Sequence, residues 1–326
     1  MEQIDILMAT YNGEKYIKEQ LDSIINQTYK NIRIIISDDA STDNTSKILR
    51  EYEKKDNRII VYLQEKNIGS NANFEFLMKK VESKYYMFSD QDDVWFDNKV
   101  EKTYFKILST GASLVCTDLL LVDENLNSLN DTFNHKMKKL YKLKKYDDWK
   151  MVFLYNVVTG CTIMAKKQYI NKILPLPINK NILHDHFIPL VISNYEKIAY
   201  LDEPTMYYRQ HSSNQVGTKK YTDKFNDFNE VRNYLIDLKI SIFTTYIERK
   251  KCFNEEFNLL AKEGLEYFKY IKDCKNINFK KLNIFMKIYK YDTTFFIFWN
   301  FILFNIPILA KIGYKFKKLV KRMCNK

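Results

Sequence analysis

Short apolar strands that alternate with amphipathic helical segments fill the first third of the sequence. The runs at residues 4–9 (IDILMA), 32–37 (IRIIIS) and 85–89 (YYMFS) are rich in β-branched, aromatic and other apolar residues, as in buried strands. Between the first two, apolar residues recur at helical spacing, for example at Ile17 and Leu21. This alternation predicts an α/β fold with a mostly parallel, doubly wound sheet flanked by helices.

Later in the chain the pattern is looser. Strand-like runs occur at residues 157–165, 198–201 and 206–209, and a helical, basic region follows them. We therefore predict one domain over residues 1–224 and a C-terminal helical region over residues 225–326.

Three polar motifs follow the carboxyl ends of the three strands named first. TYNG lies at residues 10–13, DDASTDNT at residues 38–45 and SDQDD at residues 89–93. In doubly wound sheets, ligands bind beyond the carboxyl ends of the strands. The three motifs therefore predict one binding site at this edge of the sheet.

The SDQDD motif places Asp90, Asp92 and Asp93 next to one another. Like charges this close repel and raise one another's pKa, and a hard divalent cation removes the repulsion. Mn²⁺ or Mg²⁺ takes carboxylate and phosphate oxygens as ligands, so we expect such an ion here. The alternative is a surface turn or cap before a helix at residues 99–108.

The DDASTDNT motif offers two acids, Asp38 and Asp39, where helix capping needs neither, because Ser41 and Asp43 can cap the helix that follows. A carboxylate accepts a hydrogen bond from the imide of uracil or thymine, and Tyr11 from the neighbouring strand end can pack beside that base. We favour base binding over a second capping role.

The net charge of +12 is concentrated at the C-terminus, where residues 311–326 hold seven basic residues and no acidic one. Such a surface suits nucleic acid, anionic lipid or a phosphorylated substrate, and a general lysine bias is the alternative. Acids at the predicted site would repel a phosphate backbone, so we expect no nucleic-acid partner.

Five cysteines are scattered through the chain without a CxxC pair: Cys116, Cys161, Cys252, Cys274 and Cys324. This spacing fits neither a zinc site nor a disulfide framework and indicates a reducing cytoplasm. The first residues lack a basic segment followed by an apolar one, so we expect no signal peptide.

Four segments, in this order, resemble family 2 glycosyltransferases with the GT-A fold: ATYNGEKYI, QTYKNIRIIISDDASTDNT, NIGSNANFE and MFSDQDDVW. The resemblance covers residues 1–215 and is greatest to bacterial rhamnosyltransferase-type members that assemble surface polysaccharides such as capsule or O-antigen. It implies a Rossmann-like GT-A domain and transfer of a sugar from a nucleoside-diphosphate donor.

The resemblance also implies roles for residues at matching positions. The donor nucleotide would be held by Thr10, Tyr11, Asn12, Asp39 and Asp90. The metal ligands would be Asp92 and His211. Arg209 would meet the diphosphate or the acceptor.

Three further residues concern the acceptor. Asp185, in the segment LHDH, matches the catalytic base, although a histidine stands where the family usually has Glu before Asp. Gly160 and Cys161 occupy the place where family members shape the acceptor pocket. The segment YRQH departs from the QxxRW signature of processive relatives, which favours single additions.

The implied reaction inverts the anomeric carbon, with a general base on the acceptor hydroxyl and a divalent ion on the leaving diphosphate. The donor would be dTDP-rhamnose or a UDP-sugar. Two alternatives remain open from the residues. One is a sugar-phosphate nucleotidyltransferase, although its glycine-rich loop is missing, and the other is a non-enzymatic basic module for membrane or nucleic acid.

Residues 293–310 (TTFFIFWNFILFNIPILA) contain no charge and precede the basic tail. A spanning helix needs about 20 apolar residues, so this run favours a segment lying in the bilayer interface over a membrane span or core packing. We expect peripheral attachment to the inner face of the cell membrane and a saccharide acceptor on a polyprenyl diphosphate lipid.

Overall fold

The computed structural model describes residues 2–133, 152–153, 156, 158–211, 228–273, 286 and 288 of the chain. The chain divides into two compact units, Met1–Gln215 and Val216–Lys326. The run at residues 293–310 and the basic tail lie outside the described residues.

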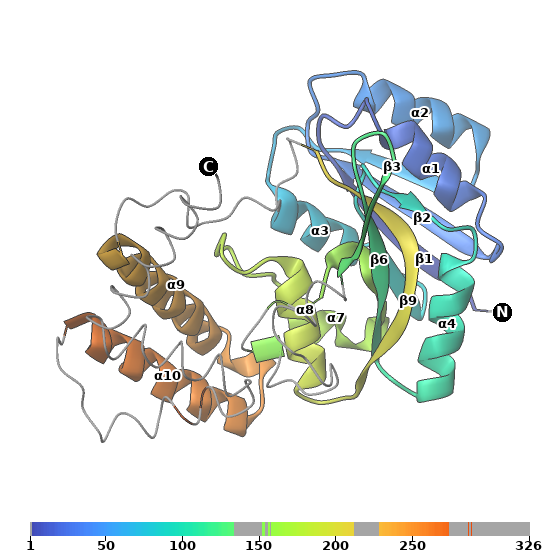
Figure 1. The fold of residues 1–326 in the computed structure, drawn as a ribbon. Coiled ribbons are helices and arrows are strands. Elements are labelled where there is room, and N and C mark those ends of the chain that lie inside the picture. The colour runs from blue at the N-terminus through green and yellow to red at the C-terminus, as the bar shows by residue number, and fades with distance from the viewer. Residues whose placement is uncertain are drawn as a thin grey trace. The chain divides into compact units, whose positions relative to one another are not determined.

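The described residues of the first unit form a nine-stranded sheet (Figure 1). Its strands are β1 (Ile4–Thr10), β2 (Ile32–Asp38), β3 (Ile59–Leu63), β4 (Tyr85–Ser89), β5 (Val94–Trp95), β6 (Leu114–Val122), β7 (Ser128–Thr132), β8 (Ile163–Lys166) and β9 (Ile198–Arg209). Their order is β3-β2-β1-β4-β8-β6-β9-β5, with β7 paired to β6.

The first four strands are parallel to one another, which confirms the parallel sheet predicted for this part of the chain. β9 is parallel to β6, whereas β8, β7 and β5 pair antiparallel. The sheet is therefore parallel in its N-terminal half and mixed beyond β4.

Helices cover both faces of this sheet. They are α1 (Ile17–Ile25), α2 (Thr45–Lys55), α3 (Ser70–Met78), α4 (Lys99–Thr110), α7 (Ile170–Ile173) and α8 (His184–Ser193). Helices α1, α2 and α4 lie on one face and α3, α7 and α8 on the other (Figure 1). Successive side chains of β1 point to opposite faces of the sheet. Ile4 and Ile6 pack in the hydrophobic core between the sheet and α1, α2 and α4, whereas Leu7 is buried on the other face.

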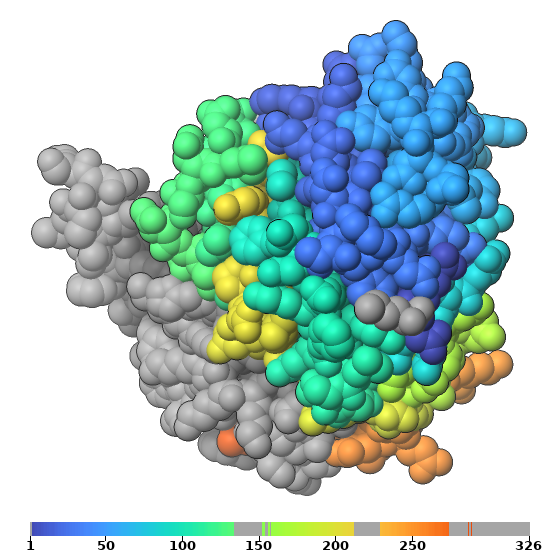
Figure 2. All heavy atoms as spheres, turned by 90° about the vertical axis from the view of Figure 1, so that its right-hand side faces the viewer, coloured from blue at the N-terminus to red at the C-terminus, as the bar shows by residue number. Residues whose placement is uncertain are grey.

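Two of the later strands differ from their predictions. Only β8 forms within the predicted run 157–165, because the chain makes a 3-10 turn, η1 (Gly160–Thr162), before it. The two predicted runs at 198–201 and 206–209 are one strand, β9, whose pairing with β6 continues through register shifts between them. Seen from the side of α4, the atoms of α4 lie against those of β9 and of the first fifty residues (Figure 2).

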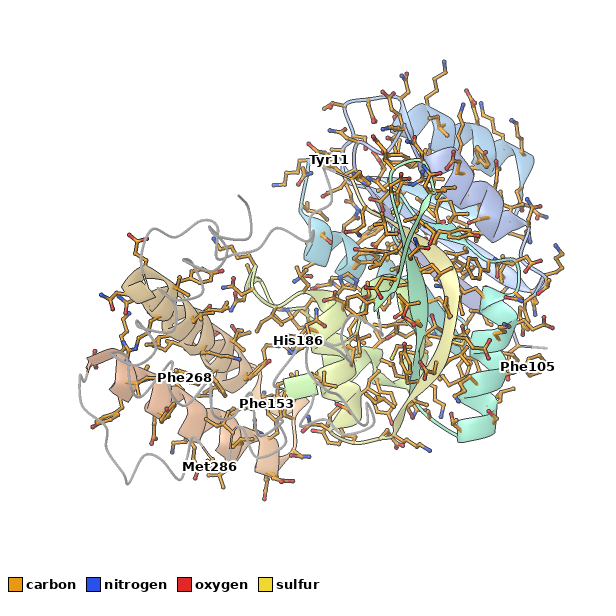
Figure 3. All side chains as sticks on the ribbon, viewed as in Figure 1. Tyr11, Phe105, Phe153, His186, Phe268 and Met286 are labelled. Carbon is orange, nitrogen blue, oxygen red and sulfur yellow. The ribbon has the colours of Figure 1, made fainter. Side chains whose placement is uncertain are left out.

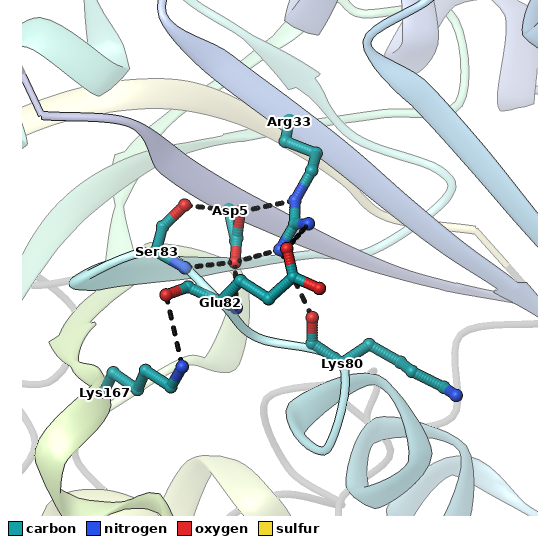
Figure 4. Close-up of polar contacts among 6 residues, drawn as sticks. All are labelled: Asp5, Arg33, Lys80, Glu82, Ser83 and Lys167. Carbon is teal, nitrogen blue, oxygen red and sulfur yellow. Dashed lines mark hydrogen bonds and ion pairs between the residues drawn. The ribbon is translucent and has the colours of Figure 1, made fainter.

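An ionic network lies near the start of β1 and β2, at the edge of the sheet opposite the polar motifs. Figure 4 shows its hydrogen bonds and ion pairs. The Asp5 carboxylate is fully buried and accepts two hydrogen bonds from the Arg33 guanidinium, at 2.9 and 2.8 Å. It also accepts the backbone N–H groups of Glu82 and Ser83 and the Ser83 hydroxyl. Burial raises the pKa of Asp5, but these hydrogen bonds outweigh it and hold the pKa below its usual value of 3.8.

We expect Asp5→Asn to destabilise the protein by about 3–5 kcal/mol at neutral pH, because it leaves the Arg33 charge without its buried partner. A carboxyl with a lowered folded-state pKa contributes stability above pH 3.8 and loses it as the pH falls below that value. The difference in melting temperature between wild type and variant should therefore shrink below pH 3.8.

Glu82→Gln is the matched control, because the Glu82 side chain is 77% exposed although it also pairs with Arg33. Exposed ion pairs contribute about 0–1 kcal/mol. A loss of stability in Glu82→Gln as large as that in Asp5→Asn would contradict the importance of the buried pair.

In the part of the second unit that the structure describes, two long helices, α9 (Phe228–Glu248) and α10 (Glu255–Asp273), pack against each other. Helical structure was predicted for this part of the chain. Gly264 allows close packing, because a Cβ there would lie 2.4 Å from the Phe243 ring. Among the described residues, no helix combines the length and apolar character needed to cross a membrane.

Candidate functional site

The three polar motifs lie at one edge of the sheet. Thr10, the last residue of β1, is level with Asp38 at the end of β2, and Met8 of β1 is level with Ser89 at the end of β4. The loops that follow these strands therefore begin side by side, as predicted from the order of strands and helices.

The TYNG loop is held by the loop after β2. The N–H of Asn12 donates to the Ser41 hydroxyl, and the Asn12 side-chain oxygen accepts the N–H of Thr42, both at 2.8 Å. The N–H of Glu14 donates to Asp43 at 3.1 Å. Asn12 has a φ of 48°, a left-handed conformation that asparagine tolerates well. These bonds preform the loop, and the expected contact of Asn12 with a nucleotide stays a prediction.

The structure gives different hydrogen-bond partners to the two adjacent acids for which we favoured base binding. Asp38 is buried and accepts the hydroxyls of Thr10 and Ser41 at 2.8 and 2.6 Å, so it joins the ends of β1 and β2. Asp39 accepts the N–H groups of Ile68 and Gly69 at 2.7 and 2.9 Å. A carboxylate accepts about four hydrogen bonds, so Asp39 retains capacity for a further donor.

Tyr11 is exposed at the end of β1. Its side chain is 42% exposed, and it lies at the rim of the first unit, well away from Phe105 on α4 (Figure 3). Thr10, in contrast, is buried, and its hydroxyl is already bound to Asp38. A ring exposed at the strand ends is available for stacking on a base.

The carboxylates of the SDQDD motif are crowded. Ligand atoms of Asp90, Asp93 and Cys161 all lie within 4.8 Å of one another. Burial, then the charges of Asp92 and Asp185, raise the pKa of Asp90 to about 7. Burial and the neighbouring charges of Asp92 and Asp90 raise the pKa of Asp93 well above its usual value, and its Oδ2 has no hydrogen-bond partner among the described residues. Full ionisation of this cluster is therefore unfavourable in its described surroundings.

Asp92 faces a different neighbour. Its Oδ2 lies 2.8 Å from Nε2 of His211, whose ring packs against Tyr16 with a centroid distance of 4.9 Å. The Arg209 side chain, only 3% exposed, donates to the main-chain oxygens of Asp92 and Glu124 at 2.8 and 2.6 Å. Arg209 thus holds the backbone that carries Asp92, and its expected contact with a diphosphate stays a prediction.

These residues fit a divalent cation of the Mn²⁺ or Mg²⁺ type. Asp92 and His211 would supply a carboxylate and an imidazole, with Asp90 nearby, and hard cations prefer such oxygen-rich surroundings. The buried Cys161 thiol is a soft ligand, and burial followed by the charges of Asp93 and Asp90 raises its pKa well above the usual value. Cys161 therefore does not suit such an ion.

Asp185 lies in the first turn of α8 and is placed by two asparagines. Asn71 accepts the backbone N–H of His184 at 2.9 Å, and the Asn156 amide donates to Asp185 Oδ1 at 3.0 Å. Burial raises the pKa of Asp185 to about 7, and its charge helps to raise the pKa of Asp90. The structure therefore brings Asp185 within electrostatic range of the acidic cluster.

The two histidines beside Asp185 point into the protein. His184 stacks on Phe74 with a centroid distance of 4.0 Å, and burial lowers its pKa to about 3. A Cβ at Gly160 would lie 2.6 Å from His184 Nε2, so only glycine fits there. His186 lies 2.8 Å from the main-chain oxygen of Val152. At neutral pH His184 is an uncharged packing residue.

A buried lysine, Lys99, contacts the site and was not predicted from the sequence. Lys99 is fully buried, and its ammonium donates to the main-chain oxygen of Cys161 at 2.8 Å and lies 4.6 Å from the Trp95 ring centre. Burial lowers its pKa to about 8, against the opposing effect of Asp93 and other nearby groups. No local signal reveals it, because a lysine that begins a helix is usually solvated.

Comparisons with known proteins agree with this geometry. The family model described as Glycosyl transferase family 2 matches residues 5–173. The dTDP-rhamnosyl transferase RfbG of Shigella flexneri is 35% identical over 240 residues, which cover 69% of this chain and 79% of that protein. The putative teichuronic acid biosynthesis glycosyltransferase TuaG of Bacillus subtilis is 30% identical over 171 residues, which cover 52% of this chain and 64% of that protein.

Solved structures share the fold at low sequence identity. S. aureus TarS 1-349 in complex with UDP-GlcNAc superposes with a TM-score of 0.56 and 15% identity, covering 88% of this chain and 81% of that chain. The mannosyltransferase PcManGT of Pyrobaculum calidifontis, in complex with GDP-Man and Mn²⁺, gives 0.51 and 13%, covering 82% and 73%. These likenesses confirm the GT-A type fold predicted from the sequence.

Proposed function

Because the chain belongs to glycosyl transferase family 2 and is thus a glycosyltransferase that uses a nucleotide sugar, we propose that it transfers the sugar, with inversion, to a hydroxyl of a saccharide acceptor. Family membership excludes the nucleotidyltransferase and the non-enzymatic module. The observation that carries the proposal is the convergence of Asp90, Asp92 and Asp185 at the edge where β1, β2 and β4 end.

The donor in this proposal is dTDP-rhamnose or a UDP-sugar. Asp39 accepts the imide N–H of the base, Tyr11 stacks on the ring, and Thr10, Asn12 and Asp90 complete the nucleoside site. The exposure of Tyr11 and the remaining capacity of Asp39 support these roles. The name of the S. flexneri relative, 35% identical, supports a thymidine donor.

Asp185 is the general base. Its ionised carboxylate accepts the proton of the acceptor hydroxyl as that oxygen attacks the anomeric carbon from the side opposite the diphosphate, and the bond to the diphosphate breaks. A pKa of about 7 leaves a substantial ionised fraction at neutral pH and makes the group a good proton acceptor. Asn156 orients the carboxylate through its hydrogen bond.

Asp92 and His211 would hold a Mn²⁺ or Mg²⁺ ion, which when bound supplies positive charge for the leaving diphosphate. Arg209 orients Asp92 from below through its backbone. The acidic cluster thus separates two tasks, because Asp92 and Asp90 serve the donor side and Asp185 serves the acceptor side.

The acceptor in this proposal is a saccharide on a polyprenyl diphosphate, and the enzyme lies on the inner face of the cell membrane in surface polysaccharide synthesis. Gly160 and Cys161 contribute to the acceptor pocket, since Gly160 lies against α8 beside Asp185. The charge of +12, the basic tail and the uncharged run at residues 293–310 support attachment to anionic lipid.

A panel of nucleotides tests the donor assignment. With Mn²⁺ present, UDP or dTDP should raise the melting temperature, whereas CDP should not, because cytosine lacks the imide N–H that Asp39 would accept. Each nucleotide sugar is then assayed for release of the nucleoside diphosphate, UDP or dTDP, and the same assay with a metal chelator is the control. No stabilisation by any nucleotide in the presence of Mn²⁺ would overturn the proposal.

A further inference from the structure

One amide side chain joins two loops of the site that are 80 residues apart in the sequence. The Gln91 side-chain oxygen accepts the N–H of Tyr11 at 2.8 Å, and its NH₂ group donates to the main-chain oxygen of Tyr11 at 2.9 Å. The ladder between β1 and β4 stops at Met8 and Ser89. Beyond it, the Gln91 amide makes both hydrogen bonds that a neighbouring strand would make with Tyr11.

Gly13 makes room for this amide. A Cβ at position 13 would lie 2.3 Å from Gln91 Oε1 and 2.6 Å from Gln91 Cδ, closer than real contacts allow. Gly13 does not have a left-handed φ, so its backbone conformation is also accessible to alanine. Gly13→Ala should therefore displace the amide and leave the loop backbone in place.

We propose that Gln91 is a positioning residue that sets the spacing between Tyr11 and the carboxylates on either side of it, Asp90 and Asp92. The inference rests on the proposed function, in which a donor places its base against Tyr11 and its diphosphate at the acids. The base and the diphosphate are parts of one covalent molecule, so the loop with Tyr11 and the loop with the aspartates must be a fixed distance apart to contact both. The two hydrogen bonds between Gln91 and Tyr11 already set that distance in the free protein.

The chemistry of position 91 is specific to an amide. A carboxylate of the same shape would accept from the Tyr11 N–H but would face the Tyr11 carbonyl oxygen, where Gln91 now donates at 2.9 Å. It would also add a fourth acid to the SDQDD motif, whose three aspartates Asp90, Asp92 and Asp93 already repel one another. Methionine matches the length of glutamine without either hydrogen bond.

The test compares ligands that engage one loop with ligands that engage both. Gln91→Met should weaken the binding of UDP or dTDP, with Mn²⁺ present, about tenfold, equal to about 1.4 kcal/mol. Binding of uridine or thymidine alone, and of inorganic pyrophosphate alone, should change less than twofold, because neither spans the two loops. Calorimetry measures the nucleotides, and ligand-observed NMR measures the weaker fragments.

Gly13→Ala is the second variant, and it removes no functional group. It should reproduce the loss for UDP or dTDP, and combining it with Gln91→Met should add little, because both break the same tie. Gln3→Met, at an exposed residue that precedes β1 at the far edge of the sheet, is the matched control and should bind as wild type does.

Melting temperatures show whether each variant is folded. If Gln91→Met does not fold, the nucleotide affinity of Gly13→Ala tests the inference. Equal losses for nucleotide, nucleoside and pyrophosphate would overturn the inference, because they indicate general damage. Wild-type affinity for UDP and dTDP in both variants would overturn it and leave the proposed function intact. A wild type that binds neither nucleotide would overturn the proposed function and, with it, the inference.

Discussion

Asp185→Asn should lower kcat by about 10²- to 10⁴-fold, the usual contribution of a positioned general base, and leave the dissociation constant of the donor unchanged. An amide matches the carboxylate in shape but accepts no proton at neutral pH. Single-turnover transfer to a saccharide acceptor measures kcat, and calorimetry with the donor nucleotide measures binding.

The pH dependence of the wild type follows from the pKa of Asp185, about 7. Only the ionised carboxylate accepts a proton, so kcat/KM should fall about tenfold per pH unit below that value and level off above it. The hydrogen bond from Asn156 lowers this pKa, so Asn156→Ala should move the acid limb to higher pH. An unmoved limb in Asn156→Ala would assign the titration to another group.

Stability offers a check on Asp185 that is independent of activity. A carboxyl whose folded-state pKa is raised destabilises the folded protein as the pH rises from 3.8 to about 7. The melting temperature of Asp185→Asn relative to wild type should therefore increase across that window. Transfer at near wild-type rate by a folded Asp185→Asn would show that another residue is the base.

Asp92→Asn should weaken Mn²⁺ binding on the order of 100-fold or more, because loss of even an outer-sphere partner costs about 10- to 100-fold. Asparagine preserves the shape beside His211, 2.8 Å away, but removes the charge that attracts the ion. Electron paramagnetic resonance of bound Mn²⁺ measures this effect directly. Turnover of the donor should be lost with it.

Asp97→Asn is the matched control for Asp92→Asn. Asp97 is exposed and lies five residues after Asp92. Its replacement by Asn therefore makes the same change in net charge without removing a predicted metal ligand. Equal loss of Mn²⁺ affinity in both variants, or unchanged affinity in Asp92→Asn, would contradict the role given to Asp92.

Local patterns predicted the first half of the sheet well and the later strands less well. β1, β2 and β4 are mostly apolar and almost wholly buried, apart from the paired Asp5 and Arg33, which is typical of strands buried on both faces. The run at 157–165 has the composition of a strand, but a tertiary contact from Lys99 to Cys161 fixes a turn there. β9 looked like two strands because its middle, around Asp202 and Glu203, is polar.

The sequence predicted which residues lie at the candidate site more completely than it predicted which of their atoms are free to bind a ligand. Asp39 and Tyr11 are at the predicted strand ends. The Tyr11 ring is exposed, whereas Asp39 is buried and each of its oxygens accepts one backbone N–H. Arg209 and Asn12 are there too, but the structure shows their polar groups bound within the protein. A motif identifies which residues meet, whereas a hydrogen bond decides which atoms remain free for a ligand.

The alternating strands and helices, and hence the meeting of three polar motifs at one edge of the sheet, can be read from the amino-acid order, because side-chain periodicity and connection rules act over short stretches of chain. Long-range packing, in contrast, is needed to know that Gln91 binds Tyr11, that Lys99 donates to Cys161 and that Arg209 donates to Asp92. Those pairs are 80, 62 and 117 residues apart. Their partners are chosen by packing and by the need to satisfy buried polar groups, which no local pattern records.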